Sequence, residues 1–129
     1  MATVTRSRAS RAALTEPEAG PRPDWSPVPR PGCVNVEGRV LLLREGLAVA
    51  MLKFDAEATI DEHAAPYEID VVCLEGEGFI SIEDKIWDFR RGLTLTWPAD
   101  RVHRLWTAEH SMLTLMVERP GALSAPAIG

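Results

Sequence analysis

The feature that most limits what this chain can fold into is a succession of short runs rich in Val, Ile, Leu and Thr, each ended by Gly, Pro or Asp. Runs of this kind form β-strands, and the residues that end them form turns. Helical periodicity is sparse, so the sequence predicts an all-β domain. We expect strands at residues 34–36, 39–44, 47–54, 69–74, 79–82, 86–89, 93–97, 102–106 and 112–118, with tight turns at 45–46, 75–78, 84–85 and 91–92.

The chain length of 129 residues suits one domain with a real core. Residues 1–30 contain half of the prolines, which disfavour both helix and ladder bonding, so we interpret them as a proline-rich N-terminal arm. Trp25 and Val28 are the residues expected to attach part of this arm to the body. The barrel domain is predicted at 31–120, followed by a flexible tail at 121–129.

Charge and hydropathy exclude several classes of protein. The net charge of −5 argues against nucleic acid as a partner. The longest apolar stretch, residues 47–52, ends at Lys53 and is far shorter than the roughly 20 residues that cross a bilayer. The two cysteines, Cys33 and Cys73, do not indicate a disulfide framework. We therefore expect a soluble cytoplasmic protein without a membrane segment.

Alternation along the strands indicates which side chains share the interior. If His103 points inward, Leu105 and Thr107 do so too, and Trp106 points outward. The same alternation predicts a mostly apolar interior made by Ile69, Val71, Cys73, Ile80, Ile82, Leu93, Leu95 and Trp97.

The stretch from Gly92 to His103 resembles the second sequence motif of the cupin superfamily. Gly92, Pro98 and His103 fall on motif positions, while Asp100 and Thr107 stand where the family usually has Gly and Asn. The fold implied by this resemblance is the double-stranded β-helix, a jelly-roll barrel, spanning roughly residues 40 to 118.

The first cupin motif is resembled by residues 61–76. His63 matches its second histidine, Asp61 takes the place of its first histidine, and Glu68 follows His63 at an allowed interval. The distance from Glu68 to Gly76 is one residue too long, so counting back from Gly76 places Ile69 in the carboxylate position. Two alternatives stay open: either a β-bulge turns Glu68 inward, or Glu68 faces solvent and the usual metal site is incomplete.

The resemblance implies a divalent transition metal (Fe, Mn, Zn, Ni or Cu) held by His63, His103 and Glu68, with Asp61 as a further oxygen candidate. Tyr67, Trp97 and Leu105 are the residues expected to line a pocket for a small organic substrate. Our leading hypothesis is a metal-dependent cupin. The fold hosts dioxygenase, isomerase and lyase reactions, and of these we favour an oxygenase-like reaction.

Two other functions remain open. The first is a metal-free, sensor-type binding module in which the histidines bind a small organic acid or sugar. The second is a role in assembly, because Val72, Leu74, Phe79 and Trp106 are expected to give the outer face of a sheet an apolar character. From this face we predict a homodimer, or else cover by the N-terminal arm.

Overall fold

The computed structural model describes residues 14–121, which contain eight strands and no helix. The expectation of an all-β domain is therefore confirmed. The strands are β1 (Arg22–Pro27), β2 (Cys33–Arg44), β3 (Leu47–His63), β4 (Ile69–Ile82), β5 (Lys85–Arg90), β6 (Thr94–Trp97), β7 (His103–Trp106) and β8 (Met112–Glu118).

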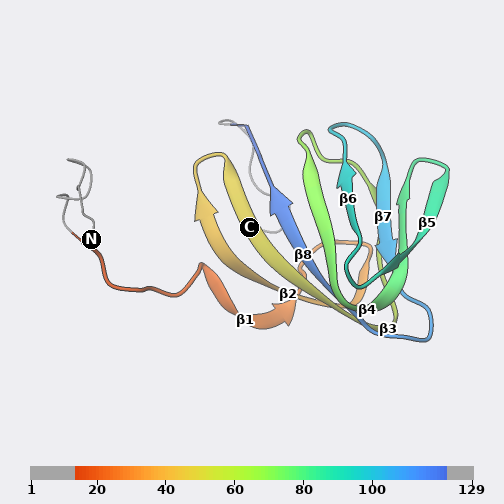
Figure 1. Ribbon diagram of the computed structural model, residues 1–129, viewed down its shortest axis with the longest axis horizontal. Coiled ribbons are helices and arrows are strands. Elements are labelled where there is room, and N and C mark those ends of the chain that lie inside the picture. The colour runs from red at the N-terminus through yellow and green to blue at the C-terminus, as the bar shows by residue number, and fades with distance from the viewer. Residues whose placement is uncertain (1–13, 122–129) are drawn as a thin grey trace, which may run out of the picture.

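A closed ring of antiparallel pairs makes the barrel (Figure 1). Strand β3 pairs with β8 and β7, and β4 pairs with the same two strands, so the ring runs β3, β8, β4, β7 and back to β3. The first parts of β3 and β4 flank β8, and their last parts flank β7, so each long strand belongs to both walls. Strands β1 and β2 extend one side of the barrel, while β5 and β6 extend the other through β4.

Backbone bends let the long strands pass from one wall to the other. Residues with positive φ stand at these bends: Asn35 in β2, Glu57 in β3 and Gly76 in β4. A side chain at position 76 would collide with the carbonyl group of Ser111, so this close approach of two backbones requires glycine. The tight turn predicted at 75–78 is therefore wrong, because these residues continue β4 through a bulge between Cys73 and Glu75.

The N-terminal arm is partly a strand. Residues 22–27 form β1, which pairs antiparallel with β2 at the edge of the sheet, where proline costs little ladder bonding. Trp25 is half-buried, with Lys53 4.6 Å and Arg39 5.4 Å from its ring centroid. Residues 1–13 of the predicted arm and 122–129 of the predicted tail lie outside the described residues.

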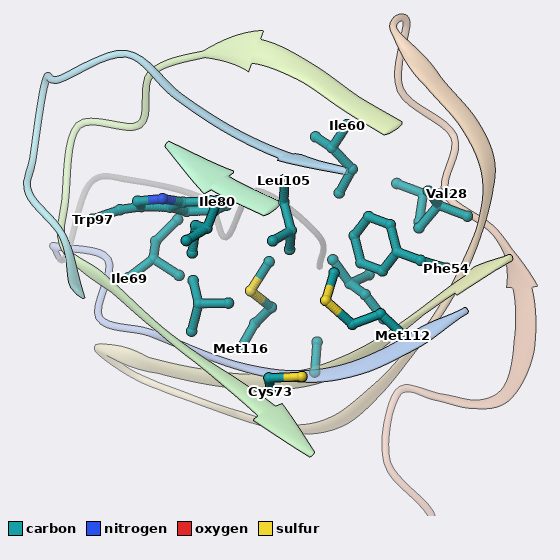
Figure 2. Close-up of a cluster of buried hydrophobic side chains, with 14 of the residues drawn as sticks. Val28, Phe54, Ile60, Ile69, Cys73, Ile80, Trp97, Leu105, Met112 and Met116 are labelled. Atoms are coloured by element: carbon teal, nitrogen blue, oxygen red, sulfur yellow. The ribbon is translucent and has the colours of Figure 1, made fainter. Parts of the chain in front are cut away.

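The core fills the barrel with the side chains that alternation predicts (Figure 2). Ile69, Val71 and Cys73 of β4 are buried, as are His103 and Leu105 of β7. Leu93 is the exception, since it precedes β6 and is exposed. In Figure 2, Trp97 and Ile69 lie at one end of the cluster, and Phe54 and Val28 lie toward the other.

The outward side chains of β4 and β7 partly cover one another. Val72, Leu74, Phe79 and Trp106 are half-buried, and the rings of Phe79 and Trp106 stack with centroids 5.6 Å apart. The homodimer expected through this face stays a prediction.

No helix long and apolar enough to span a membrane occurs within residues 14–121.

Candidate functional site

Two imidazoles meet at one end of the barrel. His63 ends β3 and His103 begins β7, and the two residues are partners in the antiparallel pairing of these strands. Between the pairs Ile60–Leu105 and His63–His103, two residues of β3 oppose one residue of β7. This extra residue turns His63 to the inner face that Ile60 also occupies. Without the bulge, alternation would point Glu62 inward in its place.

The two rings approach each other through the same type of nitrogen atom. The Nε2 atoms of His63 and His103 are 3.3 Å apart, and the ring planes lie at 78° with centroids separated by 4.6 Å. Nδ1 of His63 lies 2.8 Å from the backbone carbonyl of Asp61. Because a carbonyl only accepts, Nδ1 carries the proton, and the lone pair of His63 is on Nε2, which faces His103.

Both imidazoles are held in the neutral form. The pKa of His103 is lowered to about 3, mainly by burial, with the neighbouring His63 and Arg30 acting in the same direction. Burial likewise lowers the pKa of His63, with Arg30 acting in the same direction. Neutral imidazole has a free nitrogen lone pair, which can accept a hydrogen bond or bind a metal ion.

Trp97 forms a flat wall beside the pair. Its indole is 2% exposed and stacks on the ring of His103, with centroids 3.8 Å apart and an interplanar angle of 3°. Figure 2 shows Trp97 beside Ile69 and Ile80 at this end of the barrel. The stack fixes the orientation of the His103 ring and leaves little freedom for rotation of either side chain.

The prediction of Glu68 as a metal ligand needs correction, because its side chain is exposed and lies 3.4 Å from Arg119 at the surface. Ile69 points inward at this place and is 3% exposed. The bulge that absorbs the extra residue exists, but it lies beyond Cys73 and so leaves Glu68 outside. Asp61 is also exposed, where its carboxylate accepts a hydrogen bond from Thr59 at 3.0 Å.

Of the three residues predicted to line a pocket, Trp97 borders a small cavity, whereas Tyr67 and Leu105 are not among the residues that line it. Leu105 is fully buried in the core, and Tyr67 is buried with its hydroxyl group on Glu118. The cavity next to His63 has a volume of only about 10 Å³, at the lower limit for one water molecule. Its lining residues are Val28, Arg30, Cys33, Ile60, His63, Ile69, Trp97, Met116 and Glu118.

Sequence reasoning missed two charged residues of this cavity, Arg30 and Glu118. Glu118 could have been found from alternation, since it continues the inward series Met112, Thr114 and Met116 of β8. Arg30 lies between β1 and β2, in the segment that the prolines predict to be an arm, and no periodic pattern marks it. Within residues 14–121, no group of three or more His, Cys, Asp or Glu side chains is placed to hold a metal ion.

Comparison with known structures defines the fold family. One similar structure is described as a cupin 2 conserved barrel domain protein from Rhodopseudomonas palustris. It superposes with a TM-score of 0.66 at 14% identity, over 72% of this chain and 66% of that chain. The domain has the fold of the cupin barrel proteins.

Two further structures are similar to this domain. The polyketide cyclase RemF from Streptomyces resistomycificus has a TM-score of 0.74 at 15% identity, over 88% of this chain and 83% of that one. A conserved protein of unknown function from Streptococcus pyogenes has a TM-score of 0.60 at 28% identity, over 67% of this chain and 76% of that one. No protein-family model matches the sequence, and no curated protein matches it.

Proposed function

We propose that this cupin acts on a small organic molecule at a divalent transition metal ion held by His63 and His103. The observation that carries the proposal is the 3.3 Å separation of the two Nε2 atoms. Two nitrogen atoms that each lie about 2.1 Å from one ion, at a tetrahedral angle, are about 3.4 Å apart. The pair therefore has the spacing of two ligands of a common ion.

The residues fit part of a metal shell. Two neutral imidazoles are present, and the Asp61 carbonyl that fixes the tautomer of His63 is the kind of partner that orients metal-bound histidines. Glu68 does not contribute, so water and substrate atoms would fill the remaining positions. A bound ion would act there as a Lewis acid toward a substrate oxygen.

The protein's own side chains would position the substrate. Trp97 offers a flat apolar wall, and Arg30 is a cation at the same cavity. A ligand larger than water needs the segment from Val28 to Cys33 to move, because side chains of this segment form one wall of the cavity. The likeness to RemF, described as a polyketide cyclase, supports action on an organic molecule.

The surface position of Glu68 also bears on the type of reaction. The oxygenase-like hypothesis relied on two histidines and one carboxylate, the set used by non-haem iron oxygenases. With Glu68 at the surface, the two-histidine centre favours Lewis-acid chemistry, such as isomerisation, elimination or cyclisation, over oxygen activation.

The second candidate function is a metal-free binding module. Its support is the absence, within residues 14–121, of a third His, Cys, Asp or Glu side chain placed to complete a metal site. In such a module, the imidazole pair would form hydrogen bonds with a small organic acid or sugar.

Elemental analysis distinguishes the two candidates. The protein would be purified without a chelator or a histidine tag, together with the variants His63→Ala and His103→Gln and the surface control Glu68→Gln. We expect a transition metal near one ion per chain in the wild type and the control, and its loss in both histidine variants. Circular dichroism verifies that the variants fold. A wild-type protein without metal, even after incubation with Zn²⁺, would exclude the metal-dependent function and favour the binding module.

A further inference from the structure

A short surface segment, residues 28–32, forms the outer wall of the cavity beside the imidazole pair. It connects β1 to β2, and its side chains alternate between the barrel and the solvent. Val28 is buried and Arg30 is half-buried, and both line the cavity. Pro29 and Pro31 are exposed. The segment therefore turns an apolar and a cationic side chain toward the site and its prolines toward water.

Few backbone bonds tie this segment to the barrel. Within residues 14–121, two hydrogen bonds join it to neighbouring strands. One runs from the N–H group of Val28 to the carbonyl group of Val36 in β2, at 3.2 Å. The other runs from the N–H group of Asp61 in β3 to the carbonyl group of Gly32, at 3.0 Å. Prolines have no N–H group to donate, and a segment with so few bonds can open locally while the strands stay folded.

An apolar side chain anchors the segment. Val28 is 7% exposed and belongs to the core, where Figure 2 shows it beside Phe54. Gly38 of β2 leaves the space for it, because a Cβ atom at position 38 would lie 3.3 Å from Cγ2 of Val28. Opening the segment takes this side chain out of its apolar surroundings, so the burial of Val28 favours the closed form.

The closed segment limits access to the imidazole pair. The guanidinium group of Arg30 contributes to the lowered pKa of both His63 and His103, so its charge lies close to each ring. The cavity has a volume of about 10 Å³, and His103 is 1% exposed. A ligand larger than one water molecule therefore reaches the pair only when a wall moves.

We propose that residues 28–32 are a lid that swings about Gly32 and admits the ligand to the imidazole pair when Val28 leaves the core. Gly32 joins the segment to β2 and has a φ of 82°, in the region that favours glycine, so its backbone suits a hinge. This role rests on the proposed function only in taking the imidazole pair as the binding site. It holds for the metal-dependent and the metal-free candidate alike.

The test measures how fast diethyl pyrocarbonate, a reagent much larger than the cavity, modifies each histidine of the metal-free, full-length protein at pH 7.5. Peptide mass spectrometry distinguishes the three histidines of the chain, and the exposed His110 is the internal reference. We expect slow but measurable modification of His103 and fast modification of His110. A wild type that reacts at His110 and never at His103 would show that the lid does not open, and would overturn the proposal.

A disulfide bond that locks the lid gives the sharper comparison. A Cβ atom at position 32 would lie 3.2 Å from Cβ of Asp61, close to the separation of about 3.5–4.5 Å found in disulfides. The variant carries Gly32→Cys and Asp61→Cys, with Cys33→Ser to remove a competing thiol. We expect His103 to react at least about tenfold more slowly in the oxidised than in the reduced form, with His110 unchanged. Equal rates at His103, in protein shown to contain the disulfide, would refute the lid.

Val28→Ala tests the anchor without a disulfide, and it decides the question if the disulfide does not form. Loss of two buried methyl groups should raise the rate at His103 about tenfold. Val40→Ala is the matched control, because Val40 is a buried valine of β2 outside the lid. Urea denaturation of both variants corrects the rates for global unfolding.

If the corrected rate at His103 is the same in Val28→Ala and Val40→Ala, the ring is reached without a lid and the proposal fails. The elemental analysis that tests the metal site does not depend on these rates. Failure of the lid and failure of the proposed function are therefore separate results.

Discussion

Acidification from pH 7.5 to 5.0 is expected to destabilise the metal-free protein, chiefly through His103. The folded protein holds the pKa of this imidazole at about 3, whereas an unfolded chain has a pKa of about 6.5. His103 causes no loss of stability above pH 6.5, because its imidazole is then neutral in both the folded and the unfolded state. As the pH falls from 6.5 toward 3, only the unfolded state takes up the proton, so stability is lost over this range.

The size of this effect follows from the linkage relation. One proton costs at most about 1.4 kcal/mol per pH unit, so the loss through His103 reaches about 2 kcal/mol at pH 5.0. The side chain is 1% exposed, so solvent provides little screening of this effect. His63 adds a loss of the same sign, because burial lowers its pKa too.

Urea denaturation at several pH values, with EDTA present, measures this loss. The variant His103→Gln starts from a lower stability but loses this part of the pH dependence, so the comparison uses slopes rather than absolute stabilities. His110→Gln, which removes an exposed imidazole of the described chain, serves as the control. Parallel slopes for the wild type and His103→Gln between pH 6.5 and 5 would refute the assignment of a buried, neutral His103.

Four substitutions test the packing of the barrel and its site, each by urea denaturation at pH 7.5. Trp97→Ala removes the indole that stacks on His103 and should cost about 3–5 kcal/mol, and a loss below about 1 kcal/mol would show that the stack is not tightly packed. Gly92 has a positive φ and open space around it, so Gly92→Ala should cost about 1–2 kcal/mol of stability. Gly76 also has a positive φ, and a side chain there would meet the Ser111 carbonyl, so Gly76→Ala should cost about 1–3 kcal/mol more than Gly92→Ala. Equal losses for the two variants would contradict this difference. Tyr67→Phe removes the hydrogen bond to Glu118 and should cost about 1–3 kcal/mol, and an unchanged stability would argue against that bond.

Local patterns predicted the strands and their faces, but not where long strands bend. The alternation of β4 and β7 is a property of neighbouring residues, so the inward positions of Ile69 and His103 follow from the sequence. The glycine at position 76 is typical of a turn, and only the approach of Ser111 from β8's preceding loop shows that it serves a bend within β4. The contact with Ser111, which is distant in the sequence, therefore determines that Gly76 serves a bend and not a turn.

The same distinction applies to the site. The motif spacing singled out His63 and His103, and cross-strand pairing explains why they meet. An extra residue between Glu68 and Gly76 indicates a bulge without locating it, and its position beyond Cys73 leaves Glu68 at the surface. Glu118 belongs to an alternating strand, yet nothing in that strand's pattern shows that its last residue borders the cavity of His63.

The claim on which the functional account depends is that the Nε2 atoms of His63 and His103 bind one metal ion. Anomalous diffraction at the zinc absorption edge, from crystals grown with Zn²⁺, tests it directly. We expect a peak about 2.1 Å from both nitrogen atoms. Zinc bound only elsewhere, with the two imidazoles joined by a hydrogen bond, would contradict it.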